Sequence, residues 1–169
     1  MAFNVNIANS CKVITIRGKR YDATSTQADI TFTDIDSNSS ITVVMNYDAN
    51  TGRGNINVPT SNLPSDFGVY MVCVEEQSVQ YACKPLLIKC DIECCLVKLT
   101  NELIDCSCDC PRCASALAKA QKIFLLLESA VSAVDLASTN VSNKGYYEDI
   151  LAKYKKAKEI CDNSCGCDC

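Results

Sequence analysis

Residues 66–75 read Asp-Phe-Gly-Val-Tyr-Met-Val-Cys-Val-Glu, a turn sequence that leads directly into a stretch of β-branched and aromatic residues. Similar stretches of Thr, Val, Ile and Tyr alternate with polar residues in the first half of the chain, and turn residues separate them, which is typical of β-strands. We expect strands at residues 3–7, 12–17, 28–33, 40–46, 54–58, 69–75 and 79–89. Strands at this spacing, without a helical period between them, predict an antiparallel β-sandwich over residues 1–90.

The Asp-x-Gly-x-Tyr motif at Asp66, Gly68 and Tyr70 sharpens this prediction. It matches the tyrosine corner of immunoglobulin-like domains, in which the tyrosine hydroxyl ties a strand to the loop before it. Two features differ from antibody domains: the chain has no Trp, and Cys73 follows Tyr70 by three residues instead of two. The alternative is a turn followed by an ordinary amphipathic strand, and both interpretations keep an all-β N-terminal domain.

The period of the apolar residues changes after residue 90. Apolar residues recur every three or four positions over residues 92–103, 112–138 and 146–161, which predicts three helices. Polar residues 138–145 separate the last two, so we expect these to form an antiparallel hairpin. The predicted fold class is α+β, with an immunoglobulin-like β-sandwich at residues 1–90 followed by a small cysteine-rich helical hairpin module at residues 91–169.

The second predicted helix carries more apolar surface than a hairpin needs. Beside its first apolar stripe lies a second, formed by Ile123, Leu126, Ala130 and Ala133. Packing between two helices alone would leave one of these stripes in water. Either the first helix of this half covers the second stripe, or a neighbouring protomer or another protein does. We take the second stripe as the candidate interface.

The composition argues against several classes of function. The chain has 169 residues and a net charge of -4, with no basic stripe to grip phosphates, so we expect no direct nucleic-acid partner. No apolar run is long enough to cross a membrane, and residues 1–20 lack the layout of a secretory signal, so we expect synthesis in a cytoplasm and no membrane partner. The absence of His removes the commonest general base, and we expect no enzymatic activity.

The chain contains 14 cysteines. Eight of them form two segments that are near mirror images, C-x-C-x-C-x-x-C before the predicted hairpin and C-x-x-x-C-x-C-x-C after it. They are Cys106, Cys108, Cys110, Cys113, Cys161, Cys165, Cys167 and Cys169. An antiparallel hairpin brings both segments to the same end, and the final residues are long enough to make up the difference between the helix lengths. We therefore expect the eight thiol groups to meet.

Two chemistries suit such a meeting. Thiolates bind zinc tetrahedrally, and eight of them could build two all-cysteine sites that need no His, so these cysteines are candidate zinc ligands. Disulfides between the two segments are the equal alternative, because a bond between neighbouring C-x-C cysteines would be strained. Cys110 and Cys113 have the C-x-x-C spacing of redox motifs, but a structural role accounts for all eight cysteines together.

A small β-sandwich precedes a helix with the sequence Ile92-Glu93-Cys94-Cys95-Leu96-Val97-Lys98-Leu99, and the C-x-C-x-C-x-x-C segment, a long hairpin and a terminal Cys165-Gly166-Cys167-Asp168-Cys169 follow. This order resembles the small virion proteins of tailed phages that infect gut bacteria, particularly the crAss-like phages. The resemblance implies a structural component of the particle, a neck or tail ring protein around the portal–tail axis. Its partners would be further copies of itself and other virion proteins of the portal, tail or neck. No binding residue carries over, because no functional motif matches position by position.

The resemblance also reconciles the many cysteines with the absence of a secretory signal. A virion protein is assembled in the host cytoplasm and then released by lysis into a different redox setting, whereas disulfides rarely persist in a cytosol. The second hypothesis is a cytosolic cysteine-rich zinc-binding protein, which predicts metal bound to an isolated monomer.

Overall fold

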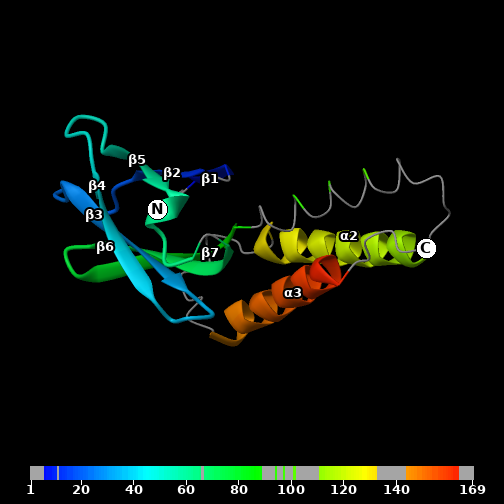
Figure 1. The fold of residues 1–169 in the computed structure, drawn as a ribbon. Helices are drawn as coiled ribbons and strands as arrows, with labels where there is room; N and C mark the ends of the chain where they lie inside the picture. Colours follow the sequence, from blue (N-terminus) through cyan, green and yellow to red (C-terminus); the bar gives the residue numbers. More distant parts are fainter. Residues whose placement is uncertain are drawn as a thin grey trace.

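The computed structural model describes residues 6–10, 12–65, 67–88, 94, 97, 101, 111–132 and 144–163. In this part of the chain, antiparallel sheets come first and helices follow (Figure 1), so the α+β class is confirmed. The strands are β1 (Asn6–Ser10), β2 (Val13–Lys19), β3 (Gln27–Asp34), β4 (Ser40–Asn46), β5 (Arg53–Pro59), β6 (Gly68–Glu76) and β7 (Val79–Ile88), with the 3-10 turn η1 (Thr60–Asn62) after β5. The helices are α2 (Pro111–Ser132) and α3 (Lys144–Asp162).

The strands form two sheets that pack face to face. One sheet has the strand order β1-β2-β5 and the other the order β4-β3-β6-β7, and the paired strands run antiparallel. The chain changes sheet after β2, after β4 and again after β5. Side chains from both sheets share one buried apolar core, which includes Ile14, Ile16, Ile30, Phe32 and Val72.

Strand β6 illustrates how the sequence pattern produces this packing. Successive side chains of a strand point to opposite faces of its sheet. Tyr70, Val72 and Val74 are buried in the core between the sheets, whereas Met71 and Cys73 are only partly buried on the outer face. The outer face of β6 is therefore available for contacts with other parts of the molecule.

The Tyr70 hydroxyl ties β6 to the loop before it, as the sequence motif predicted. This hydroxyl donates a hydrogen bond to the backbone oxygen of Ser65 at 2.6 Å and accepts one from the Ser65 backbone N–H at 2.8 Å. Gly68, which lies between Ser65 and Tyr70 in the sequence, has a φ of 126°, a backbone conformation that residues other than glycine rarely adopt. The predicted tie is confirmed; Asp66 of the motif lies outside the described residues.

Helices α2 and α3 lie side by side, run antiparallel and pack on β6 and β7 (Figure 1). Val69 of β6 and Leu87 of β7, which are register partners, enter a second apolar cluster on the outer face of the sheet. The helices contribute Ala120, Ile150, Tyr154 and Ala157 to the same cluster. The expected antiparallel packing of these two helices is confirmed, and the pair shares this buried cluster with the sandwich; residues 133–143, which connect them, lie outside the described residues.

The boundaries of the predicted elements can be compared directly. Predicted strands 28–33, 40–46, 54–58 and 69–75 agree with β3 to β6 to within one residue at each end. The first predicted strand ends too early, because β1 continues to Ser10, where it still pairs with Val13. Most of the predicted helix 92–103 lies outside the described residues, but its Cys94, Val97 and Asn101 are helical and exposed. Residues 133–138 of the second predicted helix and the proposed domain boundary at 90 and 91 also lie outside the described residues.

Candidate functional site

The direction of the two helices bears on the predicted meeting of thiol groups. Helix α2 begins, and α3 ends, toward the end of the hairpin that points away from the sheets (Figure 1). At a rise of about 1.5 Å per residue, the 22 residues of α2 and the 19 of α3 give similar lengths of about 33 and about 28 Å. The chain segments that carry the two groups of cysteines therefore join the hairpin toward the same end.

The eight cysteines themselves are not described in enough detail to test their chemistry. Cys106, Cys108, Cys110, Cys165, Cys167 and Cys169 lie outside the described residues. Cys113 belongs to α2 and Cys161 to α3, but their side chains lie outside the description too. Their meeting, and the choice between zinc and disulfides, stay predictions.

One side of α2 exposes large apolar side chains. Leu125 and Leu126 have exposed fractions of 64% and 51%. Ala120 and Phe124 belong instead to the cluster shared with α3 and the sheet. Of the predicted interface stripe, Leu126 is exposed; the side chains of Ile123 and Ala130, and all of Ala133, lie outside the described residues.

Leu125 is an exposed residue that the sequence reasoning missed. Steps of three and four residues from Ile123 select Leu126 and Ala130 but pass over Leu125. With 3.6 residues per turn, Leu125 lies about 100° around the helix from Phe124 and about 100° from Leu126. The signal that could have identified it is the uninterrupted apolar run at residues 123–127, which is too wide for one stripe.

The exposed face of α3 is charged, in contrast to that of α2. Lys153 pairs with Asp149 at 2.6 Å and Lys158 with Asp162 at 3.2 Å, both at the i, i+4 spacing of helix surfaces. Lys155 pairs with Asp36 of the β3–β4 turn at 2.6 Å, between two half-exposed side chains. Exposed pairs of this kind contribute little to stability; of these three pairs, the Lys155 pair is the one that joins α3 to the sandwich.

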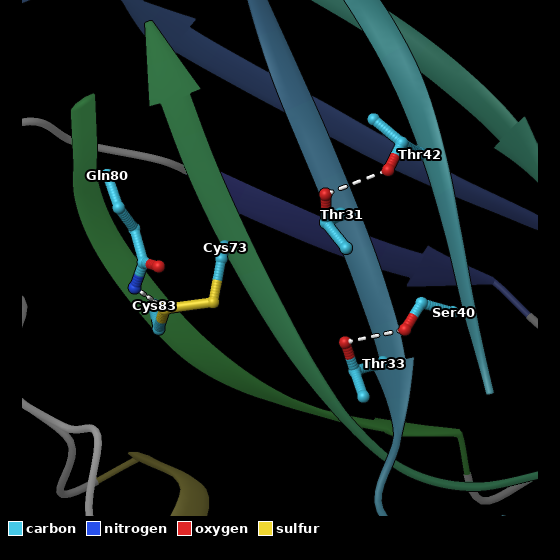
Figure 2. Close-up of a disulfide and its surroundings, with 7 residues drawn as sticks. All are labelled: Thr31, Thr33, Ser40, Thr42, Cys73, Gln80 and Cys83. Atoms are coloured by element: carbon cyan, nitrogen blue, oxygen red, sulfur yellow. Dashed lines mark hydrogen bonds between the residues drawn. A yellow bond between two sulfur atoms is a disulfide. The ribbon is translucent and has the colours of Figure 1, made fainter. Parts of the chain in front are cut away.

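A disulfide joins Cys73 of β6 to Cys83 of β7. Figure 2 shows it on the sheet beside β3 and β4, where hydroxyl pairs link Thr31 to Thr42 and Thr33 to Ser40. Thr42, Thr31, Cys73 and Cys83 are successive register partners and so form one row across all four strands. This disulfide lies within one sheet and crosslinks adjacent strands.

The pairing of Cys73 with Cys83 depends on an irregularity of the β6–β7 hairpin. Next to the turn, Glu76 pairs with Val79 and Glu75 with Gln80, but beyond the register shift Val74 pairs with Ala82. Tyr81 is the extra residue of this bulge. Without the bulge, Cys73 would lie opposite Ala82. The sequence shows two cysteines ten residues apart around a tight turn, but it does not reveal the shift that aligns them.

Glu76 is a buried carboxylate at the end of β6, with an exposed fraction of 1%. It accepts hydrogen bonds from the Tyr47 hydroxyl at 2.7 Å and from the backbone N–H groups of Tyr21 and Asp22 at 3.2 and 3.1 Å. Burial, and then the hydrogen bond to Glu76, raise the pKa of Tyr47 above its usual range. Tyr21 also stacks on Tyr81, with ring centroids 4.5 Å apart. Glu76 is therefore satisfied, and it anchors the loop after β2 to the sandwich.

The chain matches no protein-family model and no curated protein. Among the described residues, no three His, Cys, Asp or Glu side chains are grouped to hold a metal ion. No helix in the same part of the chain is both long and apolar enough to cross a membrane. The functional interpretation therefore depends on this chain's own residues and on the resemblance in the order of its segments.

Proposed function

We propose that the β-sandwich is immunoglobulin-like. Three features support this: a three-stranded sheet packed on a four-stranded one, a chain that crosses between them three times, and a tyrosine hydroxyl bonded to the preceding loop. The Cys73–Cys83 disulfide lies within one sheet, whereas antibody domains join their two sheets. The proposal is therefore for the wider immunoglobulin-like class and not for an antibody-type domain.

We further propose that the protein is a non-enzymatic structural component of a tailed-phage virion, a neck or tail ring protein that assembles around the portal–tail axis. The exposed pair Leu125 and Leu126 on α2 carries this proposal. Burial of one leucine side chain contributes roughly 1.5–3 kcal/mol, so a partner that covers both gains substantial association free energy. In a ring, this face of one copy would meet a different surface on the next copy.

The Cys73–Cys83 disulfide favours this proposal over a cytosolic zinc-binding protein. Disulfides persist in oxidising surroundings and are rare in a reducing cytosol. A particle released by lysis reaches such surroundings, whereas a zinc-binding protein that remains in the cytosol does not. The charged surface of α3 would stay in solvent, because Lys153, Lys155 and Lys158 already have carboxylate partners.

The decisive test measures assembly and incorporation together. We expect the wild-type chain to form an oligomer by light scattering and to be found by mass spectrometry in purified particles. Leu126→Asp should lower the oligomer mass and prevent incorporation, because it places a charge in the apolar contact. Ala152→Asp, at an exposed position of α3, is the matched control and should do neither.

Two results would overturn the proposal. If Leu126→Asp assembles and enters particles like the wild type, this face of α2 is not the assembly surface. If the wild-type chain is a monomer that carries zinc by elemental analysis and is missing from particles, the zinc-binding alternative replaces the virion proposal.

A further inference from the structure

Strand β4 lies at an open edge of the four-stranded sheet, whereas the helices pack on β6 and β7 at the other side (Figure 1). Its sequence, Ser-Ile-Thr-Val-Val-Met-Asn, includes no charged residue and no proline. It pairs with β3 in an unbroken register. A regular, uncharged edge strand rich in β-branched residues presents backbone groups on which another strand can pair.

The other edges of the two described sheets are less suited to pairing. β7 contains Lys84, Pro85 and the bulge at Tyr81. β5 contains Arg53 and Pro59, and β1, with five residues, is the shortest of the described strands. Charged residues, proline, bulges and short length are the features by which native proteins prevent association between sheet edges. β4 has no such protection.

Backbone hydrogen bonds at both ends of the β3–β4 pair show which residues of β4 bond to β3. Residues opposite each other in an antiparallel pair alternate between pairs that exchange two backbone hydrogen bonds and pairs that exchange none. Beyond one end of the register, the Asp34 N–H donates to the Ser39 carbonyl at 2.9 Å. Beyond the other end, the Tyr47 N–H donates to the Thr26 carbonyl at 2.9 Å. Steps of two residues from either bond select the same residues of β4, which are Ile41, Val43 and Met45.

The alternate residues of β4 therefore direct their backbone groups away from β3, toward the open edge. These residues are Ser40, Thr42 and Val44. Their side chains leave the edge accessible: the hydroxyls of Ser40 and Thr42 bond to Thr33 and Thr31 of β3 (Figure 2), and Val44 is 47% exposed. The bridge from Tyr47 to Gly54 of β5 lies beyond the end of β4.

We propose that β4 pairs with β4 of a second copy of this chain, antiparallel and centred on Thr42. In this register Thr42 lies opposite Thr42 of the second copy, and Ser40 lies opposite Val44. Each of these opposite pairs can exchange two backbone hydrogen bonds, so the residues that face the open edge all find partners. The four-stranded sheets of the two copies then form one continuous sheet.

The chemistry of β4 favours a second copy as the partner. Because β4 is uncharged, pairing with itself places no like charges opposite each other. On the core side, Ile41 lies opposite Val43 of the second copy, and both side chains already pack against the core of their own sandwich. Pairs of β-branched side chains stabilise adjacent strands, and the two-fold axis repeats each contact.

The neighbouring registers are less favourable. A shift of the pairing in one direction places Asn46 opposite Ser40, and Asn46 adjoins the bridge to β5. A shift in the other direction places Asn38 opposite Val44, and Asn38 belongs to the β3–β4 turn with a φ of 62°. The contact is isologous and does not involve α2, so it is separate from the ring contact proposed above.

The first experiment measures the mass of the full chain carrying Leu126→Asp, so that the α2 face does not contribute. A single strand is a small interface, so the dimer should be weak and reversible. Between about 10 µM and about 1 mM, sedimentation equilibrium should show a mass that rises from 18.4 kDa toward twice that value. A chain that remains monomeric at the highest concentration would overturn the proposal and leave β4 to a different partner.

Hydrogen exchange of the wild-type chain locates the contact. The backbone amides of Thr42 and Val44 point to the open edge, so they should exchange several times more slowly at high than at low protein concentration. Those of Ile41 and Val43 bond to β3 within one copy and serve as internal controls. Equal exchange of the Thr42 and Val44 amides at both concentrations would contradict pairing at this edge.

A charge exchange at Thr42 tests the register. In the Leu126→Asp chain, Thr42→Lys places two lysines opposite each other at the two-fold axis, and Thr42→Glu places two glutamates there. Each variant alone should dimerise about fivefold more weakly, because like charges directly opposite each other destabilise paired strands. An equal mixture should form a heterodimer more tightly than either variant alone.

Asn55→Lys and Asn55→Glu are the matched controls, at an exposed position of edge strand β5. Alone or mixed, they should dimerise like the Leu126→Asp chain without a further change. If Thr42→Lys and Thr42→Glu also dimerise like that chain, or if their mixture is no tighter than either alone, the pairing centred on Thr42 is wrong.

Discussion

Removal of the Cys73–Cys83 disulfide should destabilise the protein mainly through its unfolded state. The bond closes a short loop, with a sequence separation of 10. For a loop of this size the chain-entropy model gives a contribution of about 2.7 kcal/mol at 25 °C, and we expect Cys73→Ser/Cys83→Ser to lose this amount. Small domains have total stabilities of roughly 5–15 kcal/mol, so the loss is a large fraction.

Urea unfolding followed by far-UV circular dichroism measures this effect directly. The double variant should unfold at lower urea concentration. Its slope of free energy against urea should be steeper, because an unfolded chain without the crosslink exposes more surface. Cys94→Ser is the matched control: Cys94 is a free, exposed cysteine, and its replacement should change the free energy of unfolding by less than about 0.5 kcal/mol.

The reasoning fails if the double variant loses no more stability than the control. That result would mean that the β6–β7 hairpin is already held together in the unfolded chain, or that the two thiols do not pair in solution. Titration of free thiols under denaturing conditions separates these two explanations. The wild-type chain shows two fewer free thiols if Cys73 and Cys83 are paired than if they are not.

Two further predictions concern the core. Burial and the Glu76 hydrogen bond raise the pKa of Tyr47 in the folded protein. Above about pH 10, the Tyr47 hydroxyl therefore stays protonated in the folded protein but ionises in the unfolded chain. The free energy of unfolding should be constant with respect to this group below that pH and fall by about 1.4 kcal/mol per pH unit above it. In urea unfolding at alkaline pH, the free energy of unfolding of Tyr47→Phe should therefore fall less steeply with pH than that of the wild type. An equal fall contradicts the prediction. Ile150→Ala in the cluster shared by hairpin and sheet should cost about 2–5 kcal/mol, and hairpin and sandwich should still unfold in one calorimetric transition; two transitions would show that they are not coupled.

The alternation of residues predicted most of the β-structure because side-chain direction repeats every two residues in a strand. Both ends of the strand at residues 40–46 were predicted correctly, and the Tyr70 hydroxyl forms the predicted hydrogen bond to the backbone of the preceding loop. The helical period likewise predicted the two helices that α2 and α3 confirm. These features depend on local periodicity, which a sequence displays directly.

The candidate sites were less predictable. Leu126 belonged to the predicted interface stripe but Leu125 did not, because a helical step pattern selects one stripe and does not say which directions remain uncovered. The polar pocket that Ser25 and Glu75 both line left no sequence signal, since these residues are 50 positions apart. Only the approach of the loop after β2 to the β6–β7 turn brings them together.

By itself, the sequence determined the division into strands and helices, the alternation of buried and exposed positions, and the turn that precedes Tyr70. Tertiary structure alone decided which cysteine lies opposite Cys73, because the one-residue bulge at Tyr81 shifts the register of β7. It also decided that the outer side of β6 is covered at Val69 by the hairpin and carries the disulfide at Cys73. The physical reason is that periodicity specifies the direction of each side chain, whereas its partner depends on how separate segments are aligned in space.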